Sequence, residues 1–207
     1  MRRARLRCHG HGVRAGLLTA LIRGVVAELG ERAEDPARVL GEINHSLTPI
    51  LERTGQPVFA TAFFGVIDTA TASLVYSNAG HPPPLILRSD SDVVARLVPA
   101  DPEPAAGLID GYSYTRHETP FNAGDFLLAY TDGVIEAADA AGEIFGDERL
   151  RTHLVQSRGL PGAEVSDRLV RTLETYSGRQ DFEDDVCIVT IESTGTTCTI
   201  QPANYEI

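Results

Sequence analysis

Apolar positions near the start of the chain recur at helical spacing. Two stripes follow the i, i+3, i+4, i+7 pattern, the first with Leu18, Leu21, Ile22, Val25, Val26 and Leu29, the second with Val39, Leu40, Ile43, Leu47, Ile50 and Leu51. Such stripes are typical of helices with one buried face, so two successive helices are predicted. Asp35-Pro36 is expected to begin the second helix, and Pro49 is expected to kink or break it.

Shorter apolar runs bounded by turn residues predict strands in the rest of the chain. The expected strands cover 58–68, 73–77, 85–87, 93–98, 112–119, 126–130 and 186–191. Two further helices are expected, one after Gly146 and one beginning near Pro161. The two ends show no clear period, so residues 1–9 are expected to form a disordered basic leader and residues 193–207 a loose tail.

The apolar run from Phe126 to Tyr130 is the central feature of the prediction. It ends abruptly at Thr131-Asp132-Gly133. A carboxylate at the mouth of a core needs a partner, since an unpaired buried charge is costly. A second acidic cluster, with Asp184 and Asp185, precedes the strand predicted over 186–191. Hard divalent cations prefer oxygen ligands. We therefore predict that the fold brings Asp132 and Asp184 together around Mg²⁺ or Mn²⁺.

Purely structural roles are the alternative interpretations of these acids. Asp132 could be a turn residue that caps a strand, and Asp184 and Asp185 could belong to a solvated acidic loop. Glu136 is interpreted as a local structural acid rather than a ligand.

Composition narrows the class of protein. The 207 residues carry a net charge of −11, and the pI of about 4.9 argues against a nucleic-acid-binding surface. No apolar run approaches the roughly 20 residues that span a bilayer, and no signal-peptide core is evident, so the cytoplasm is the expected location. The three cysteines are far apart in the sequence, which disfavours a disulfide framework or a thiolate zinc site.

A glycine-histidine cluster precedes the first predicted helix. Gly10, His11 and Gly12 would let backbone approach a ligand closely, next to a helix N-terminus that favours anions. Zinc binding by His9 and His11 is disfavoured because no third ligand is nearby in the sequence.

Taken in order, these motifs resemble one family. They are Gly10-His11-Gly12, the NAGHPPP string that ends at Pro84, the YTDGVIEA string from Tyr130 to Ala137, Ile144-Phe145-Gly146, and Asp184-Asp185 before the last predicted strand. The ordered set resembles the SpoIIE-like branch of the PPM-type, metal-dependent serine phosphatases, over about residues 10–192.

The resemblance implies an α+β fold, an α-β-β-α sandwich of antiparallel sheets flanked by helices. It also implies two Mn²⁺ or Mg²⁺ ions, with Asp132 and Asp184 as metal ligands and Gly10, His11, Gly12, Gly133 and Asp185 lining the site. The implied reaction is hydrolysis of phosphoserine on a regulatory partner, such as an anti-sigma-factor antagonist, by a metal-activated water and without a protein nucleophile. A homodimer through the helices between Gly12 and Arg53 is left open by the sequence, and family analogy makes this helical pair a candidate for regulation.

The chain departs from the family pattern in two ways. Alignment on Gly10-His11-Gly12 places Arg7 where the family has an acid that bridges both metals. The family's opening strands lie upstream of this motif, so residues 10–192 are expected to form a partial domain whose N-terminal strands are missing. A catalytically dead binding module, or a gene fragment of the family, is therefore the alternative to an active phosphatase.

Overall fold

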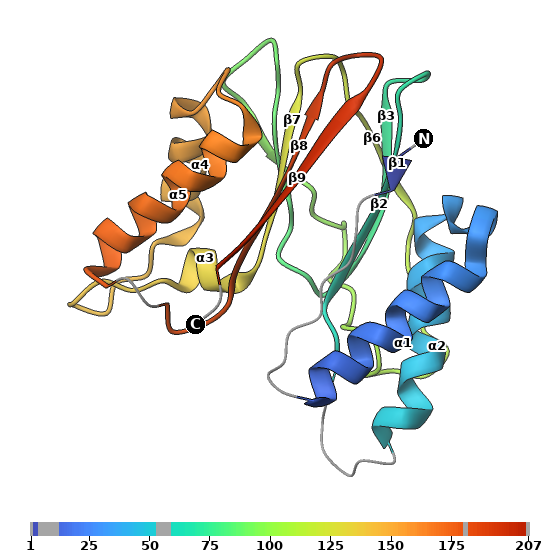
Figure 1. Ribbon diagram of the computed structural model, residues 1–207. Coiled ribbons are helices and arrows are strands. Elements are labelled where there is room, and N and C mark those ends of the chain that lie inside the picture. Colours follow the sequence, from blue (N-terminus) through green and yellow to red (C-terminus); the bar gives the residue numbers. More distant parts are fainter. Residues whose placement is uncertain (1, 4–12, 53–58, 180–181, 206–207) are drawn as a thin grey trace. The chain divides into compact units, whose positions relative to one another are not determined.

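The structure is a computed structural model that describes residues 2–3, 13–52, 59–179 and 182–205. The chain divides into two units. Unit 1 comprises Met1–His81 and Pro99–Phe121, and unit 2 comprises Pro82–Val98 and Asn122–Ile207. In each unit helices pack on an antiparallel sheet (Figure 1). Among the described residues, no helix is both long and apolar enough to cross a membrane.

Unit 1 contains two long helices and a four-stranded sheet. Its elements are β1 (Arg2–Arg3), α1 (Val13–Leu29), the short 3-10 helix η1 (Gly30–Glu34), α2 (Pro36–Glu52), β2 (Ala62–Asp68), β3 (Ser73–Ala79) and β6 (His117–Pro120). The strand order is β1-β2-β3-β6, with every neighbouring pair antiparallel.

The predicted stripe of the second helix is buried in the core of unit 1 except for Ile50, which is 46% exposed. Val39, Ile43 and Leu47 on α2 are fully buried, and α2 packs on β2 and β3 while α1 packs on α2. Asn44 on the same helix forms two hydrogen bonds with backbone groups. Its side chain donates to the Ile109 carbonyl at 2.8 Å and accepts the Gly107 N–H at 2.7 Å. The two helices predicted from apolar spacing are confirmed.

Pro49 does not break the second helix, because α2 continues to Glu52. Proline removes one N–H and so one bond to the carbonyl four residues earlier, here that of His45. His45 is exposed, so water can reach its carbonyl. Pro49 also lies in the last turn, where little helix remains to be disrupted.

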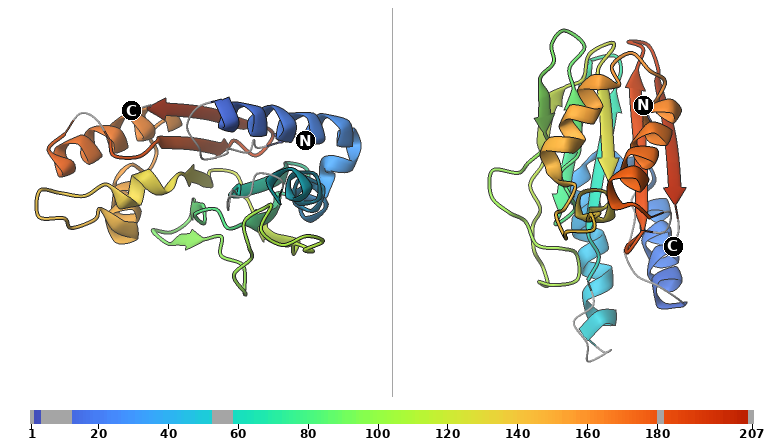
Figure 2. Two further views of the ribbon diagram at one scale, coloured as in Figure 1. Left: turned by 90° about the horizontal axis from the view of Figure 1, so that it is seen from below. Right: turned by 90° about the vertical axis from the view of Figure 1, so that its left-hand side faces the viewer.

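Unit 2 contains a five-stranded sheet and three helices. Its elements are β4 (Leu85–Leu87), β5 (Val94–Arg96), β7 (Phe126–Tyr130), α3 (Asp132–Glu136), α4 (Gly146–Gln156), α5 (Gly162–Ser177), β8 (Val186–Ser193) and β9 (Cys198–Tyr205). The strand order is β5-β4-β7-β8-β9, antiparallel throughout. Helices α4 and α5 lie against the strands of this sheet (Figure 2).

The core of unit 2 lies between its sheet and its helices. Leu128 on β7 and Ile188 on β8 are fully buried and cluster with Leu150 on α4 and Leu169 on α5. The run from Phe126 is therefore a central strand, as its unbroken apolar sequence predicted. The strand places its C-terminal end directly before Asp132.

The prediction of a loose C-terminal tail was wrong. Residues Cys198–Tyr205 form β9, which pairs with β8 from Val186↔Tyr205 to Ser193↔Cys198. The strand escaped detection because it is largely polar and contains Pro202. Its position at the edge of the sheet explains both features, since an edge strand has one open side and tolerates a proline.

The prediction of a disordered leader was wrong for its second and third residues. Arg2 and Arg3 pair with Ile67 and Val66 of β2. Backbone groups at a sheet edge accept a strand whatever its side chains, so composition alone could not reveal this pairing. Residues 1 and 4–9 of the predicted leader lie outside the described residues.

Candidate functional site

Thr131 ties the end of β7 to the start of β8. Its N–H donates to the Cys187 carbonyl at 3.0 Å. Its hydroxyl donates to the Asp185 carbonyl at 2.6 Å and accepts the Cys187 N–H at 2.9 Å. Thr131 is buried, so these bonds are shielded from water. We call residues 131–133 and 184–187 the strand-end junction.

Gly133 allows the two segments of the junction to touch. A Cβ atom at this position would lie 2.8 Å from the Asp185 carbonyl oxygen and 3.2 Å from that of Asp184. The first distance is closer than side-chain atoms tolerate, so only glycine fits without a backbone shift. The fold thus brings the peptide after Asp132 into contact with the backbone at Asp184. Metal binding by Asp132 and Asp184 stays a prediction.

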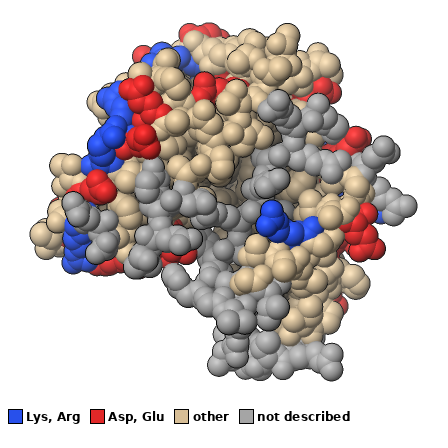
Figure 3. Space-filling view, viewed as in Figure 1, with Lys and Arg blue, Asp and Glu red and all other residues tan. Residues whose placement is uncertain are grey.

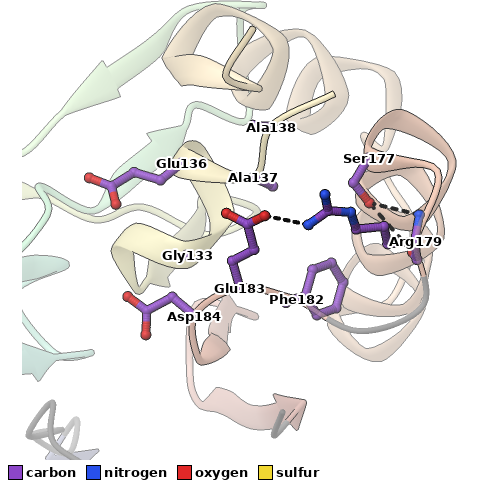
Figure 4. A pocket seen from close by; sticks show the side chains of 9 residues that line it. All are labelled: Gly133, Glu136, Ala137, Ala138, Ser177, Arg179, Phe182, Glu183 and Asp184. Carbon is purple, nitrogen blue, oxygen red and sulfur yellow. Dashed lines mark hydrogen bonds and ion pairs between the residues drawn. The ribbon is translucent and has the colours of Figure 1, made fainter. Parts of the chain in front are cut away.

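Both candidate metal ligands are half-buried. The Asp132 carboxylate accepts the N–H of Gly133 at 3.2 Å, and the Asp184 carboxylate accepts the N–H of Asp185 at 2.7 Å. Each of these bonds comes from the next residue along the chain, so it orients the carboxylate locally. Figure 4 shows that Asp184 and Glu136 point to the same side, away from Arg179.

The donor chemistry fits part of a divalent-cation site. Two carboxylates stand on segments in contact, and Mg²⁺ and Mn²⁺ prefer oxygen ligands. Within the described residues, no group of three or more His, Cys, Asp and Glu side chains could enclose a metal ion. Gly10, His11 and Gly12, predicted to line the site, lie outside those residues, as does Arg7.

A small pocket adjoins the junction, and sequence reasoning missed it. The pocket has a volume of about 230 Å³ and is formed by the ends of α3 and α5 and the segment before β8 (Figure 4). Its lining comprises Gly133, Glu136, Ala137, Ala138, Ser177, Arg179, Phe182, Glu183 and Asp184. We call it the side pocket. No local pattern marks it, because its lining residues come from two separate parts of the sequence, between 133 and 138 and between 177 and 184.

Sequence reasoning also gave Thr131 no role. The one available signal was its position, a hydroxyl residue between a buried strand and an acid. Tyr130, just before it, is buried, and burial together with the nearby charge of Asp147 raises the pKa of its phenol to about 12. Tyr130 therefore stays protonated near neutral pH and cannot serve as a base.

Acidic and basic side chains are intermingled on the outside of unit 2. Arg179 pairs with Glu183, Arg149 pairs with Glu143, and both pairs are largely exposed. Exposed pairs of this kind contribute little to stability. On the face drawn in Figure 3, red and blue atoms lie next to one another over this part of the chain.

The chain matches the family described as "Stage II sporulation protein E (SpoIIE)" over residues 8–194. Two curated relatives are Protein IcfG of Synechocystis, 39% identical over 140 residues, and Phosphoserine phosphatase RsbP of Bacillus subtilis, 23% identical over 184 residues. These alignments cover 68% and 88% of this chain. The chain spans only 22% and 43% of the length of the two relatives.

Solved structures share the fold. The SiaA-PP2C domain of Pseudomonas aeruginosa superposes with a TM-score of 0.75 at 28% identity, over 89% of this chain and 72% of that one. The catalytic domain of the serine/threonine phosphatase PstP, in complex with two manganese ions, gives 0.62 at 15% identity, over 93% and 84% of the two chains. The predicted α+β class of antiparallel sheets and helices is confirmed.

The family match covers most of the chain, and its structural neighbours are PP2C domains, which are the PPM type expected from the motifs. The chain therefore belongs to the SpoIIE family of PP2C-type phosphatase domains.

Proposed function

We propose that this chain is a metal-dependent protein serine/threonine phosphatase that hydrolyses phosphoserine on a regulatory protein. An anti-sigma-factor antagonist is the class of substrate that the sequence motifs suggest. The strand-end junction carries the proposal, because it brings Asp132 and Asp184 onto touching segments of backbone. The family match and a relative named as a phosphoserine phosphatase support it.

In this proposal Asp132 and Asp184 hold Mn²⁺ or Mg²⁺. A bound pair of such ions supplies a Lewis acid for the phosphate and an activated water. The chain's own residues position the ligands. Thr131 ties the two strand ends together, Gly133 permits their contact, and the Asp185 N–H orients the Asp184 carboxylate.

The test is Mn²⁺ titration by calorimetry on the folded chain. Asp132→Asn and Asp184→Asn should each weaken Mn²⁺ binding by at least about tenfold, because an amide replaces an anionic ligand. Asp92→Asn, an exposed carboxylate elsewhere in unit 2, serves as the matched control and should bind like the parent. Equal Mn²⁺ affinity in all four proteins would refute the assignment of the ligands.

The same variants test catalysis. Hydrolysis of a phosphoserine peptide should require Mn²⁺ or Mg²⁺, and both ligand variants should lose it while Asp92→Asn retains it. Mn²⁺ bound at Asp132 and Asp184 without any hydrolysis would leave a metal site but refute the phosphatase.

One observation favours a second candidate, a binding module without activity. Arg7 stands where the family pattern has a metal-bridging acid, and a guanidinium repels cations. For such a module, binding of a phosphorylated partner would be unchanged by a chelator. Partner binding that disappears with the metal would exclude it.

Two further expectations belong to the proposal. One is a cytoplasmic location, and the other is a homodimer formed through the helices between Gly12 and Arg53. Light scattering across a range of concentrations tests the dimer, and a monomer at all concentrations would exclude it.

A further inference from the structure

Small and apolar residues form one part of the lining of the side pocket. Ala137 and Ala138 follow α3, and Phe182, which is only 9% exposed, precedes β8. The Ser177 hydroxyl is engaged at the end of α5, where it lies 3.4 Å from the Glu174 carbonyl and accepts the Arg179 N–H at 3.3 Å. Ala137, Ala138 and Phe182 therefore offer an apolar contact area on this part of the lining.

Two of the charged side chains that line the side pocket pair with each other. The Arg179 guanidinium forms an ion pair with the Glu183 carboxylate (Figure 4). Glu136 and Asp184 point away from this pair. A charged occupant would have to break the Arg179–Glu183 pair or compete with it, whereas an apolar occupant would leave it intact.

The side pocket is continuous with the candidate metal site. Gly133 and Asp184 belong to both, because they line the pocket and form the strand-end junction. Neighbouring residues of a peptide have Cα atoms about 3.8 Å apart. A phosphoserine whose phosphate lies at Asp184 therefore carries its flanking residue to the mouth of the pocket.

We propose that the side pocket binds an apolar side chain next to the phosphoserine of the substrate protein. This inference rests on the proposed function, because it assumes that phosphoserine lies at Asp132 and Asp184. The volume of about 230 Å³ suits a single side chain, since pockets for whole small molecules usually measure about 300–1,000 Å³. An apolar anchor in a pocket of this kind is a common source of selectivity in protein recognition.

The test measures binding, so that it does not depend on catalysis. Labelled phosphoserine peptides with Leu, Ala or Glu beside the phosphoserine, on either side, are titrated with the Mn²⁺-loaded chain and followed by fluorescence anisotropy. On at least one side, the Leu peptide should bind about tenfold more tightly than the Ala peptide, and the Glu peptide should gain nothing over Ala.

Filling the side pocket should erase the preference. Ala137→Leu and Ala138→Leu are two independent ways to occupy it, and each should bring the Leu peptide to the affinity of the Ala peptide. Mn²⁺ affinity, measured on the same samples, should stay at the parent's value. Ala140→Leu places the same side chain at an exposed position two residues further on and should keep the tenfold preference.

The outcomes separate the two proposals. Equal binding of all peptides, no peptide binding, or tighter binding of the Glu peptide would overturn the pocket assignment. A Leu preference that survives in both filled variants would also overturn it. A Leu preference that the filled variants abolish, in a chain that hydrolyses none of the peptides, would support the pocket and refute the phosphatase.

Discussion

Two aspartates stand at opposite ends of β7, and they have opposite characters. Asp125 directly precedes the strand and is 2% exposed. Asp132 follows the other end and is half-buried. Both are acids at the end of the same core strand, so their sequence contexts are alike. Their surroundings differ in how deeply each side chain is buried.

The Asp125 carboxylate accepts hydrogen bonds from three groups of unit 2. It accepts the N–H of Ser89 at 2.9 Å and the N–H of Asn122 at 2.9 Å, and it pairs with the Arg88 guanidinium at 3.0 Å. These bonds join the turn before β7 to the end of β4. A carboxylate held in this way is structural, because binding a metal would strip it of donors while it is buried.

The Asp132 carboxylate accepts the N–H of its own neighbour, Gly133, at 3.2 Å. At this end of the strand the long-range bonds are made by the Thr131 hydroxyl and by backbone. The fold thus fixes the position of Asp132 through adjacent groups. The deeply buried Asp125 serves the strand, whereas the half-buried Asp132 remains accessible to a ligand.

The largest effect is expected from Asp125→Ala. The substitution removes the ion pair with Arg88 and two bonds from backbone N–H groups at a buried position, so the free energy of unfolding should fall by about 3 kcal/mol. Urea denaturation measures this change. Asp132→Asn is the matched variant at the other end and should stay within about 1 kcal/mol of the parent. Equal losses in the two variants would show that the Asp125 and Asp132 carboxylates contribute equally to stability.

Gly133→Ala should weaken both the fold and the site. The new Cβ would meet the Asp185 carbonyl at 2.8 Å, so the backbone must shift, at a cost of about 1–3 kcal/mol. Mn²⁺ affinity should fall by about tenfold, because that shift separates the segments that carry Asp132 and Asp184. Gly142→Ala, at a position with open space around its Cβ but a positive φ of 83°, controls for backbone strain alone and should leave Mn²⁺ affinity unchanged.

Thr131→Val tests the tie between β7 and β8. The shape is kept but the hydroxyl is lost, so the Cys187 N–H loses its acceptor in a buried place, at a cost of about 1–2 kcal/mol. Thr131→Ser retains the hydroxyl and should recover most of this loss. Thermal unfolding measures the difference between the two variants, and identical melting temperatures would show that the methyl group matters rather than the hydroxyl.

His153 should give the smallest effect, a dependence of stability on pH. It is buried on α4 within 3.4 Å of the Val165 carbonyl and the Ser157 hydroxyl. Burial lowers the pKa of His153 from 6.5, the Val165 carbonyl opposes that shift, and the charge of Arg168 adds to it. The unfolded chain then takes up a proton that the folded chain does not, so stability is lost as the pH falls from about 6.5 through the folded pKa.

Urea denaturation between pH 7.5 and 5 measures this dependence. His153→Gln should flatten the curve in that window by up to one proton. The exposed His45 provides the control, and His45→Gln should leave the slope unchanged. A slope that is the same in both variants would assign the effect to other groups.

The amino-acid sequence alone was enough to predict helices and strands that are marked by patterns among neighbouring residues. Helical spacing marked α1 and α2, an unbroken apolar run marked β7, and the acids at 132 and 184 stood out beside strands. The family could be recognised from the sequence because its motifs are also local, as short strings in a set order. Periodicity and turn chemistry act between residues only a few positions apart, so they can be read along the chain.

Contacts between residues far apart in the sequence became visible only in the tertiary structure. The bond from Thr131 to the Asp185 carbonyl joins residues 54 positions apart, and the lining of the side pocket comes from two distant parts of the sequence. The edge strand β9 also needed its neighbour β8, because its own sequence is polar and contains Pro202. Backbone pairing and close approach depend on what the rest of the fold places opposite a segment, and no local pattern records that.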